Sequence, residues 1–181
     1  MALRRDFEAE FRQLFDQQFA SLFRYLDRLS GDAELAADLA QETFVRLYNR
    51  GALPDDPRAW LAAVASNLLR DERRRTKRRG RLLTLHAADV PVGAAPLRPD
   101  ETFAATAERV RVRSALDALP ERDRQLLLLR HEGYSYRELA LAVGVRETSV
   151  GVMLARATAA FRAVIDPEGQ LRARGASDDR V

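Results

Sequence analysis

Apolar residues recur at steps of three and four along two stretches of this chain, and this helical spacing is lost between residues 76 and 106. The interrupting segment holds Pro91, Pro96 and Pro99 close together, a composition typical of a linker. A chain of 181 residues can hold two small domains. The sequence therefore predicts an all-α fold with two small helical domains joined by a flexible linker. The predicted parts are a first domain at 1–75, the linker at 76–106, a second domain at 107–165 and a flexible tail at 166–181.

Capping residues and glycines divide the two domains into individual helices. Gly31 and Asp32 are placed to end the first helix and to cap the second, and Asp56 with Pro57 begins the third. The predicted helices are 5–29, 33–49, 57–75, 107–119, 121–132, 136–143 and 147–164. We expect the large apolar residues of these helices to face inward, including Tyr48 and Trp60.

The residue types present argue against an enzyme. There is no cysteine, which excludes a disulfide framework, a thiolate zinc site and a cysteine nucleophile. The two histidines, His86 and His131, lie far apart in the sequence and have no metal-ligand spacing. Glu42, Glu138 and His131 are capable of acid–base chemistry, but no glycine-rich phosphate loop or nucleophile elbow accompanies them. We therefore expect no catalytic residue, no metal and no cofactor.

The sequence also predicts a cytoplasmic protein without membrane insertion. Its apolar runs are short: 126–129 holds four residues, and the longest, 59–65, holds seven. A membrane-spanning helix needs about twenty. The first residues lead into an amphipathic stretch and lack the apolar core of a signal peptide.

The positive charge of the chain is concentrated in one short run. The formal net charge is +3, yet residues 70–81 alone hold 8 basic and 2 acidic residues. A concentrated basic run is the electrostatic footprint of a nucleic-acid contact. A solvated helix end or a basic linker is the alternative interpretation.

The strongest local pattern lies between residues 136 and 156. Ala140 follows Tyr136 at a spacing that lets two helices cross closely, Gly144 suits a left-handed turn, and Val150 can pack between the helices. This is the pattern of a helix-turn-helix, although an ordinary helical hairpin remains an alternative. Its second helix would present to a major groove the residues Arg146, Thr148, Ser149, Val152 and Arg156.

A second constellation lies on the predicted third helix. Asn67, Asp71 and Arg74 are spaced by four and three residues, so they share one face. An asparagine that faces outward on a basic helix can hydrogen-bond the edge of a base. The alternative is that Asn67 is merely exposed.

Together, these stretches resemble the extracytoplasmic-function sigma factors of bacterial RNA polymerase. The matching stretches are DLAQETFVRL at 38–47, WLAAVASNLLRDERRR at 60–75, LPERDR at 119–124, and GYSYRELA at 133–140, which runs into Gly144 and Val145. Their order and spacing agree with the family over residues 7–165.

The resemblance implies that the first domain binds core RNA polymerase and the promoter −10 element. The face that would dock on the clamp helices of the largest subunit holds Asp38, Gln41, Glu42 and Arg46. The loop at 49–56 and the helix at 57–75 would read and melt the −10 element, with Asn67 at the site of an extruded base. The implied −10 residues are Asn67, Arg70, Asp71, Arg73, Arg74 and Arg75.

The resemblance also assigns the rest of the chain. The linker would thread through the polymerase active-site cleft and RNA exit path. The helix-turn-helix would read the −35 element and rest on the flap of the second-largest subunit. The whole would be an alternative sigma factor that opens promoter DNA, with an anti-sigma protein as a further partner that no residue here identifies.

One stretch departs from the family pattern. Many members carry a Lys-Ser-Arg-like run after the valine of the last helix, where this chain has Gly151, Val152 and Met153. We therefore predict a weaker or altered −35 contact. Gly151 inside a helix costs about 1 kcal/mol relative to alanine, which a close approach of DNA or protein backbone would explain.

A stand-alone helix-turn-helix regulator is the rival interpretation. It would bind duplex DNA without polymerase, usually as a dimer. It accounts for residues 136–164 but leaves the stretches at 38–46 and 60–75 without a role.

Overall fold

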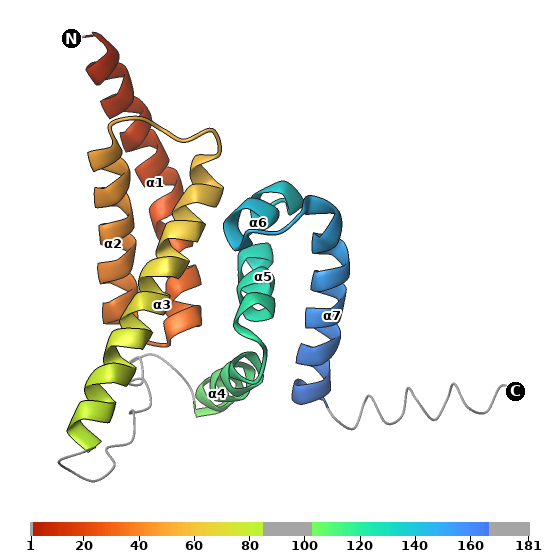
Figure 1. Ribbon diagram of the computed structural model, residues 1–181. Coiled ribbons are helices and arrows are strands. Elements are labelled where there is room, and N and C mark those ends of the chain that lie inside the picture. Colours follow the sequence, from red (N-terminus) through yellow and green to blue (C-terminus); the bar gives the residue numbers. More distant parts are fainter. Residues whose placement is uncertain (1, 85–102, 167–181) are drawn as a thin grey trace, which may run out of the picture. The chain divides into compact units, whose positions relative to one another are not determined.

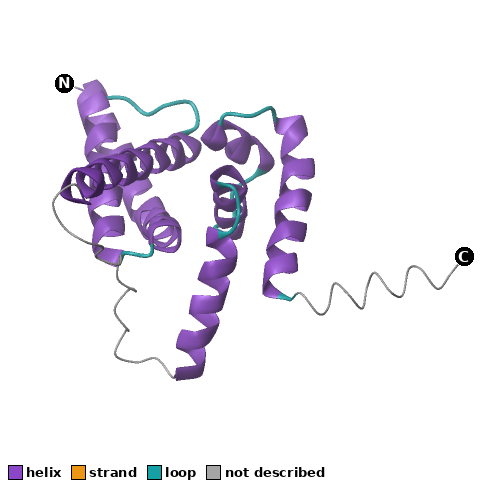
Figure 2. Ribbon diagram, turned by 60° about the horizontal axis from the view of Figure 1, so that its bottom comes forward, coloured by secondary structure: helices purple, strands orange, loops and turns teal. Residues whose placement is uncertain are grey.

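The computed structural model describes the backbone of residues 2–84 and 103–166 and the side chains of residues 6–79 and 107–166. Within these ranges every regular element is an α-helix, so the predicted all-α class is confirmed (Figure 2). The chain divides into two units, one with α1–α3 and one with α4–α7 (Figure 1).

The first unit is a three-helix assembly of α1 (Ala2–Ser30), α2 (Ala33–Arg50) and α3 (Pro57–Thr84). The predicted caps are present. Oδ1 of Asp32 accepts a hydrogen bond from the Leu35 backbone N–H at 3.0 Å, and Oδ1 of Asp56 accepts one from that of Ala59 at 3.1 Å. Gly51 ends α2 in the left-handed conformation, with φ +72°. Because the connection between α1 and α2 is so short, α2 runs back alongside α1 (Figure 1).

The core of the first unit is built from leucine and alanine on all three helices. Its largest fully buried side chains are Leu22, Tyr25, Leu26, Leu29, Leu47, Leu61 and Leu69. The hydroxyl groups of Tyr25 and Ser66 lie 2.7 Å apart, which joins α1 to α3 by a buried hydrogen bond. A buried hydroxyl needs such a partner, so this pair also fixes how the two helices align.

Several of the expected core residues of this unit are only partly buried, Tyr48 and Trp60 among them. Tyr48 is 45% exposed, although its ring packs edge-on against Phe11 with centroids 5.3 Å apart. Trp60 is also only half-buried. The expectation of an inward position is therefore wrong for Tyr48, and Trp60 meets it in part.

The third helix is longer than predicted. It continues to Thr84, so the prediction that it ends near residue 75 is wrong. The added turns are rich in arginine, which has a high helix propensity. In the same way α4 begins at Phe103, before the predicted start at 107. Residues 85–102 of the predicted linker and 167–181 of the predicted tail lie outside the described residues.

The second unit holds α4 (Phe103–Asp117), α5 (Glu121–His131), α6 (Tyr136–Val143) and α7 (Glu147–Ile165). Helix α7 packs against all of the other three. The fully buried side chains include Leu126, Leu129, Tyr134, Leu139 and Val150. Val110 on α4 is 61% exposed.

The turn between α6 and α7 is the predicted helix-turn-helix. Ser135 and Glu138 form the expected capping box at the start of α6. Gly144 ends that helix with φ +68° and ψ +48°, and nothing lies within 4 Å of where its Cβ would be. The glycine is therefore required by backbone conformation and not by lack of space. Ala140 and Val150 are buried where the two helices cross, as the pattern predicts.

By length and composition alone, α7 is the one helix within the described ranges that could cross a membrane. A core helix of a soluble protein passes the same test. Val150, Leu154 and Ala157 on α7 are buried against the other helices of the unit.

Candidate functional site

The first candidate surface is a groove on α2, which we call the acidic groove. Helix α2 contributes the exposed side chains Asp38, Gln41, Glu42 and Val45, and α3 contributes Glu72. Leu35 and Leu39 form its apolar floor. Three carboxylates around an apolar strip can bind a partner that offers basic and apolar side chains.

Arg46 lies beside this groove and is paired within its own helix. Its Nε donates to Oε1 of Glu42 at 2.8 Å, and both side chains are about half exposed. The pair spans one helical turn, so it contributes only about 0.3–0.5 kcal/mol. Asp38, Gln41, Glu42 and Arg46 therefore share one exposed face, as the sequence predicts.

The second candidate surface is the outer face of α3. Asn67 is exposed there, and its Oδ1 accepts a hydrogen bond from Nη1 of Arg70 at 3.0 Å. Farther along, Arg74 lies 4.0 Å from Asp71 and Arg75 lies 3.7 Å from Glu72. These are loose, solvent-exposed pairs that the phosphates of a nucleic acid can displace at little cost.

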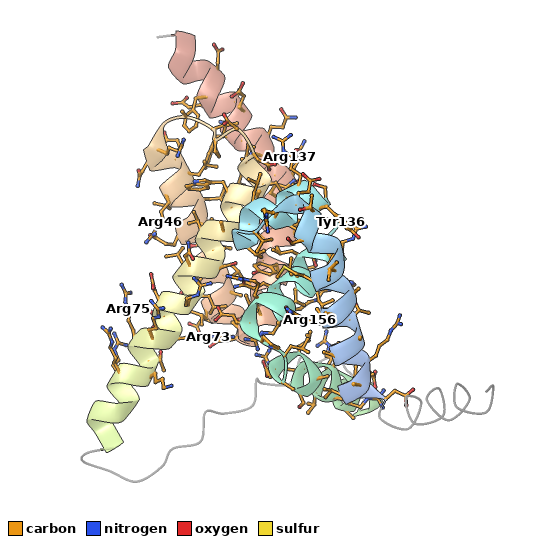
Figure 3. All side chains as sticks on the ribbon, turned by 45° about the vertical axis from the view of Figure 1, so that its right-hand side comes forward. Arg46, Arg73, Arg75, Tyr136, Arg137 and Arg156 are labelled. Carbon is orange, nitrogen blue, oxygen red and sulfur yellow. The ribbon has the colours of Figure 1, made fainter. Side chains whose placement is uncertain are left out.

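Arg73 differs from the other arginines of this run. It follows Ser66 and Leu69 at helical spacing, so it continues the buried stripe of α3. Its Nη2 donates to the carbonyl oxygen of Leu29 at 2.5 Å, near the C-terminal end of α1. Figure 3 shows Arg73 and Arg75 on different sides of α3. Arg73 thus has a structural role that sequence reasoning missed.

The extension of α3 adds basic residues that sequence reasoning left out of the site. Lys77, Arg78 and Arg79 are exposed on the same continuous helix. The basic run at 70–81 already included these three residues. They were left out of the predicted site because the helix was expected to end at residue 75.

The third candidate surface is the second helix of the helix-turn-helix. Arg146, Thr148 and Val152 are exposed around the first turns of α7, while Ser149 is half-buried. Val152 is 76% exposed, the highest value among the large apolar residues whose side chains the structure describes. The arrangement offers a cation, a hydroxyl and an apolar group to a major groove.

Arg156 also belongs to this helix, and the structure gives it an intramolecular partner. Its Nη2 lies 2.8 Å from Oδ1 of Asp123, whose side chain is only 5% exposed. The next residue, Arg124, is buried and pairs with Asp117 of α4. The charged residues of the 119–124 stretch therefore tie α5 to α4 and to α7.

Tyr136 lies at the start of α6, beside Gly151 of α7 (Figure 3). A Cβ on Gly151 would be 3.6 Å from Cε2 of Tyr136, an ordinary contact distance. Arg130 covers the Tyr136 ring at 5.5 Å and donates to the carbonyl of Tyr134 at 2.9 Å. Alanine would fit at 151 among the described residues, so none of them approaches closely enough to require this glycine.

Among the described residues, no group of three or more histidine, aspartate or glutamate side chains could hold a metal ion.

Two family models match the chain, one in each unit. The model of Sigma-70 region 2 matches residues 14–79, which hold the acidic groove and most of α3. The model of Sigma-70 region 4 matches residues 109–160, which hold the helix-turn-helix. Both models thus fall on the candidate surfaces.

Relatives with similarity along most of the chain carry one kind of name. The ECF RNA polymerase sigma factor SigL of Mycobacterium tuberculosis is 32% identical over 89% of this chain and 92% of its own length. EcfG of Rhodopseudomonas palustris is 31% identical, over 82% of this chain and 81% of its own. SigX of Bacillus subtilis is 29% identical, over 79% of this chain and 77% of its own.

A solved structure has a similar fold. It is the sigma factor RpoE of Bartonella quintana in complex with the anti-sigma factor NepR, with a TM-score of 0.64 and 19% identity. The match covers 88% of this chain and 98% of that one.

Proposed function

The chain belongs to the extracytoplasmic-function (ECF) sigma factors of bacterial RNA polymerase, and we propose from this that it binds core polymerase, recognises the −10 and −35 promoter elements and opens promoter DNA. One observation carries the proposal. The acidic groove and the basic face of α3 share one unit, and the helix-turn-helix lies in the other, each within the matching sigma model.

We propose that the acidic groove docks on the clamp helices of the polymerase largest subunit. Asp38, Gln41, Glu42 and Arg46 would make the polar contacts, and the exposed Val45 would add an apolar one. Charged groups at the rim of such a surface steer association, while the apolar strip provides burial. The interaction should therefore weaken as salt concentration rises.

For the −10 element we propose the outer face of α3. Asn67 would hydrogen-bond an extruded base after exchanging its bond to Arg70. Arg70, Arg74 and Arg75 would contact the DNA backbone, aided by the exposed basic residues of the extended helix: Lys77, Arg78 and Arg79. The partly buried Arg73 would act mainly by holding α3 to α1, and Asp71 by orienting Arg74.

For the −35 element we propose the exposed residues of the helix-turn-helix. Arg146, Thr148, Ser149 and Val152 would face the major groove. Arg156 would reach DNA only by leaving Asp123, so we assign it a smaller share. The same unit would rest on the flap of the second-largest subunit.

The rest of the proposal follows from this role. The linker would thread through the polymerase cleft, and all bond-making chemistry would belong to the polymerase and not to this chain. The site of action would be the cytoplasm. A protein that resembles this chain at the level of fold is bound to an anti-sigma factor, so such a partner is proposed here as well.

The replacement Asn67→Ala tests the proposal at its mechanistic step. Because Asn67 is exposed and only its neighbour Arg70 depends on it, the variant should fold and bind core polymerase normally. Promoter opening, followed by permanganate reactivity of unpaired thymines, should fall by about tenfold, since one good base contact is worth about 1–3 kcal/mol. Gln17→Ala, an exposed amide on α1, is the control. Equal loss of opening and of polymerase binding would contradict the assignment of Asn67.

A further inference from the structure

We propose that Val152 reads a thymine of the −35 element through the C5 methyl group of that base. This inference rests on the proposed function and names what the helix-turn-helix recognises. Val152 lies next to Gly151 in the sequence, and Tyr136 borders Gly151 in space. These three residues form what we call the apolar patch of the helix-turn-helix.

The fold fixes the direction in which Val152 points. Val150 and Leu154 are buried in the core of the unit, and Val152 lies midway between them in sequence. Two residues along an α-helix correspond to a rotation of about 200°, so Val152 faces away from the core. A valine in a helix has essentially one side-chain rotamer, so its two methyl groups are held in a defined place before any partner arrives.

The neighbouring glycine keeps this patch open. A Cβ at position 151 would already lie at contact distance from the Tyr136 ring, 3.6 Å from Cε2. With glycine there, Tyr136 is 44% exposed, and the adjoining Val152 is 76% exposed. A long basic side chain at position 151 would cover the patch and add a phosphate contact. Here that contact is absent and apolar surface is available instead.

Charged groups around the patch indicate a duplex as its partner. Arg130 lies over the Tyr136 ring, and Arg146 stands at the start of α7. Arg137, on the first turn of α6, is exposed as well. Glu147, on the first turn of α7, is exposed too, so these charged groups are one carboxylate and three arginines. Arginines in excess beside a small apolar centre suit phosphates flanking a groove. A protein partner would more often meet aromatic or aliphatic residues over a wider area.

Thymine is the base that fits this chemistry. In the major groove only thymine presents a methyl group, and small apolar side chains discriminate it by contact. Phosphate contacts do not distinguish one base from another, so the arginines position the helix on the DNA and Val152 selects thymine. This explains why residues 151–153 differ from the Lys-Ser-Arg-like run of the family. The chain loses contacts to DNA phosphates at these positions and gains a contact to a thymine methyl group.

Removing one methyl group from DNA tests the proposal. The complex of the full chain with core polymerase first selects duplexes from a random library. Each thymine of the upstream element is then replaced by deoxyuridine, which lacks only the methyl group, and the Kd is measured. We expect one thymine whose replacement raises the Kd about fourfold, the effect of exposing one methyl group. In Val152→Ala, which lacks both γ-methyl groups, the ratio between the uracil and thymine duplexes should fall toward one.

Val164→Ala is the matched control, because it makes the same change at an exposed valine at the far end of α7. It should keep the fourfold ratio. The proposal is overturned if no replacement changes the Kd of the unmodified chain, or if Val152→Ala keeps the full ratio. It is also overturned if Val152→Ala weakens binding to core polymerase without DNA, since the patch would then be a protein contact. If the complex forms but selects no sequence, the proposed function fails together with the inference.

Discussion

Replacing Arg156 with methionine should destabilise the second unit, even though the Arg156 side chain is 65% exposed. Its guanidinium lies 2.8 Å from Oδ1 of Asp123, which is 5% exposed, so the change strands a nearly buried carboxylate. Hydrogen bonds to charged groups contribute about 1.5–3 kcal/mol. Because water screens the arginine end, we expect the lower limit, about 1.5 kcal/mol.

Hydrogen exchange of the full chain is the suitable assay, since it follows each unit separately. Amides of α5 and α7 should exchange about tenfold faster in Arg156→Met, the ratio that corresponds to a loss of about 1.4 kcal/mol. Amides of α1–α3 should be unchanged. Arg162→Met, an exposed arginine farther along α7, is the control and should have no effect.

A double-mutant cycle with Asp123→Asn isolates the pair. Once the carboxylate is neutral, Arg156→Met should cost much less, with a coupling energy of about 1 kcal/mol. If exchange in α7 is the same in Arg156→Met and Arg162→Met, the ion pair is not structural. Arg156 would then be available to DNA, as the sequence alone indicates.

Two further substitutions test the two units separately. Tyr25→Phe removes the hydroxyl that lies 2.7 Å from that of Ser66, and should lower the free energy of unfolding of the first unit by about 1 kcal/mol. Urea titration followed by the fluorescence of Trp60 measures this change, and an unchanged midpoint would contradict the buried hydrogen bond. Gly144→Ala forces a φ of +68° on alanine and should lower the free energy of unfolding of the second unit by about 1–2 kcal/mol. Amide hydrogen exchange in α6 should become faster, and unchanged exchange would contradict the left-handed turn.

Local signals in the sequence predicted most of the fold. Helical spacing gave the buried faces, and short-range chemistry gave the caps: Asp32 on α2, and the Ser135–Glu138 box on α6. Gly144 was predictable because a left-handed residue at that turn favours glycine. These features depend on residues within a few positions of one another, which is why they can be read without a structure.

The features that could not be predicted depend on residues far apart in the chain. Arg73 bonds to Leu29 across 44 positions, and Arg156 pairs with Asp123 across 33. Sequence reasoning assigned both arginines to DNA. Arg73 lies in a basic run and Arg156 on the second helix of the helix-turn-helix, and no neighbouring residue in the sequence indicates that either one has a partner within the protein. The spacing of Arg73 after Leu69 was the one available hint, because it continues a buried stripe.

The helix boundaries on either side of the linker were predicted wrongly for a different reason. An arginine-rich segment is compatible both with a solvated helix and with a charged linker, and the apolar period that separates the two is absent from it. The difference matters for function, because the longer α3 also carries the exposed Lys77, Arg78 and Arg79, and Arg78 shares the face of Asn67 and Arg74.

Binding of the purified chain to bacterial core RNA polymerase tests the central claim most directly. The account predicts co-elution from a sizing column as a one-to-one complex, weakened by salt and lost when Asp38 and Glu42 are both replaced by arginine. The matched control replaces Asp6 and Glu10, exposed acidic residues of α1, and should leave co-elution intact. A folded chain that does not co-elute, yet shifts duplex DNA without polymerase, would contradict the account and favour a stand-alone helix-turn-helix regulator.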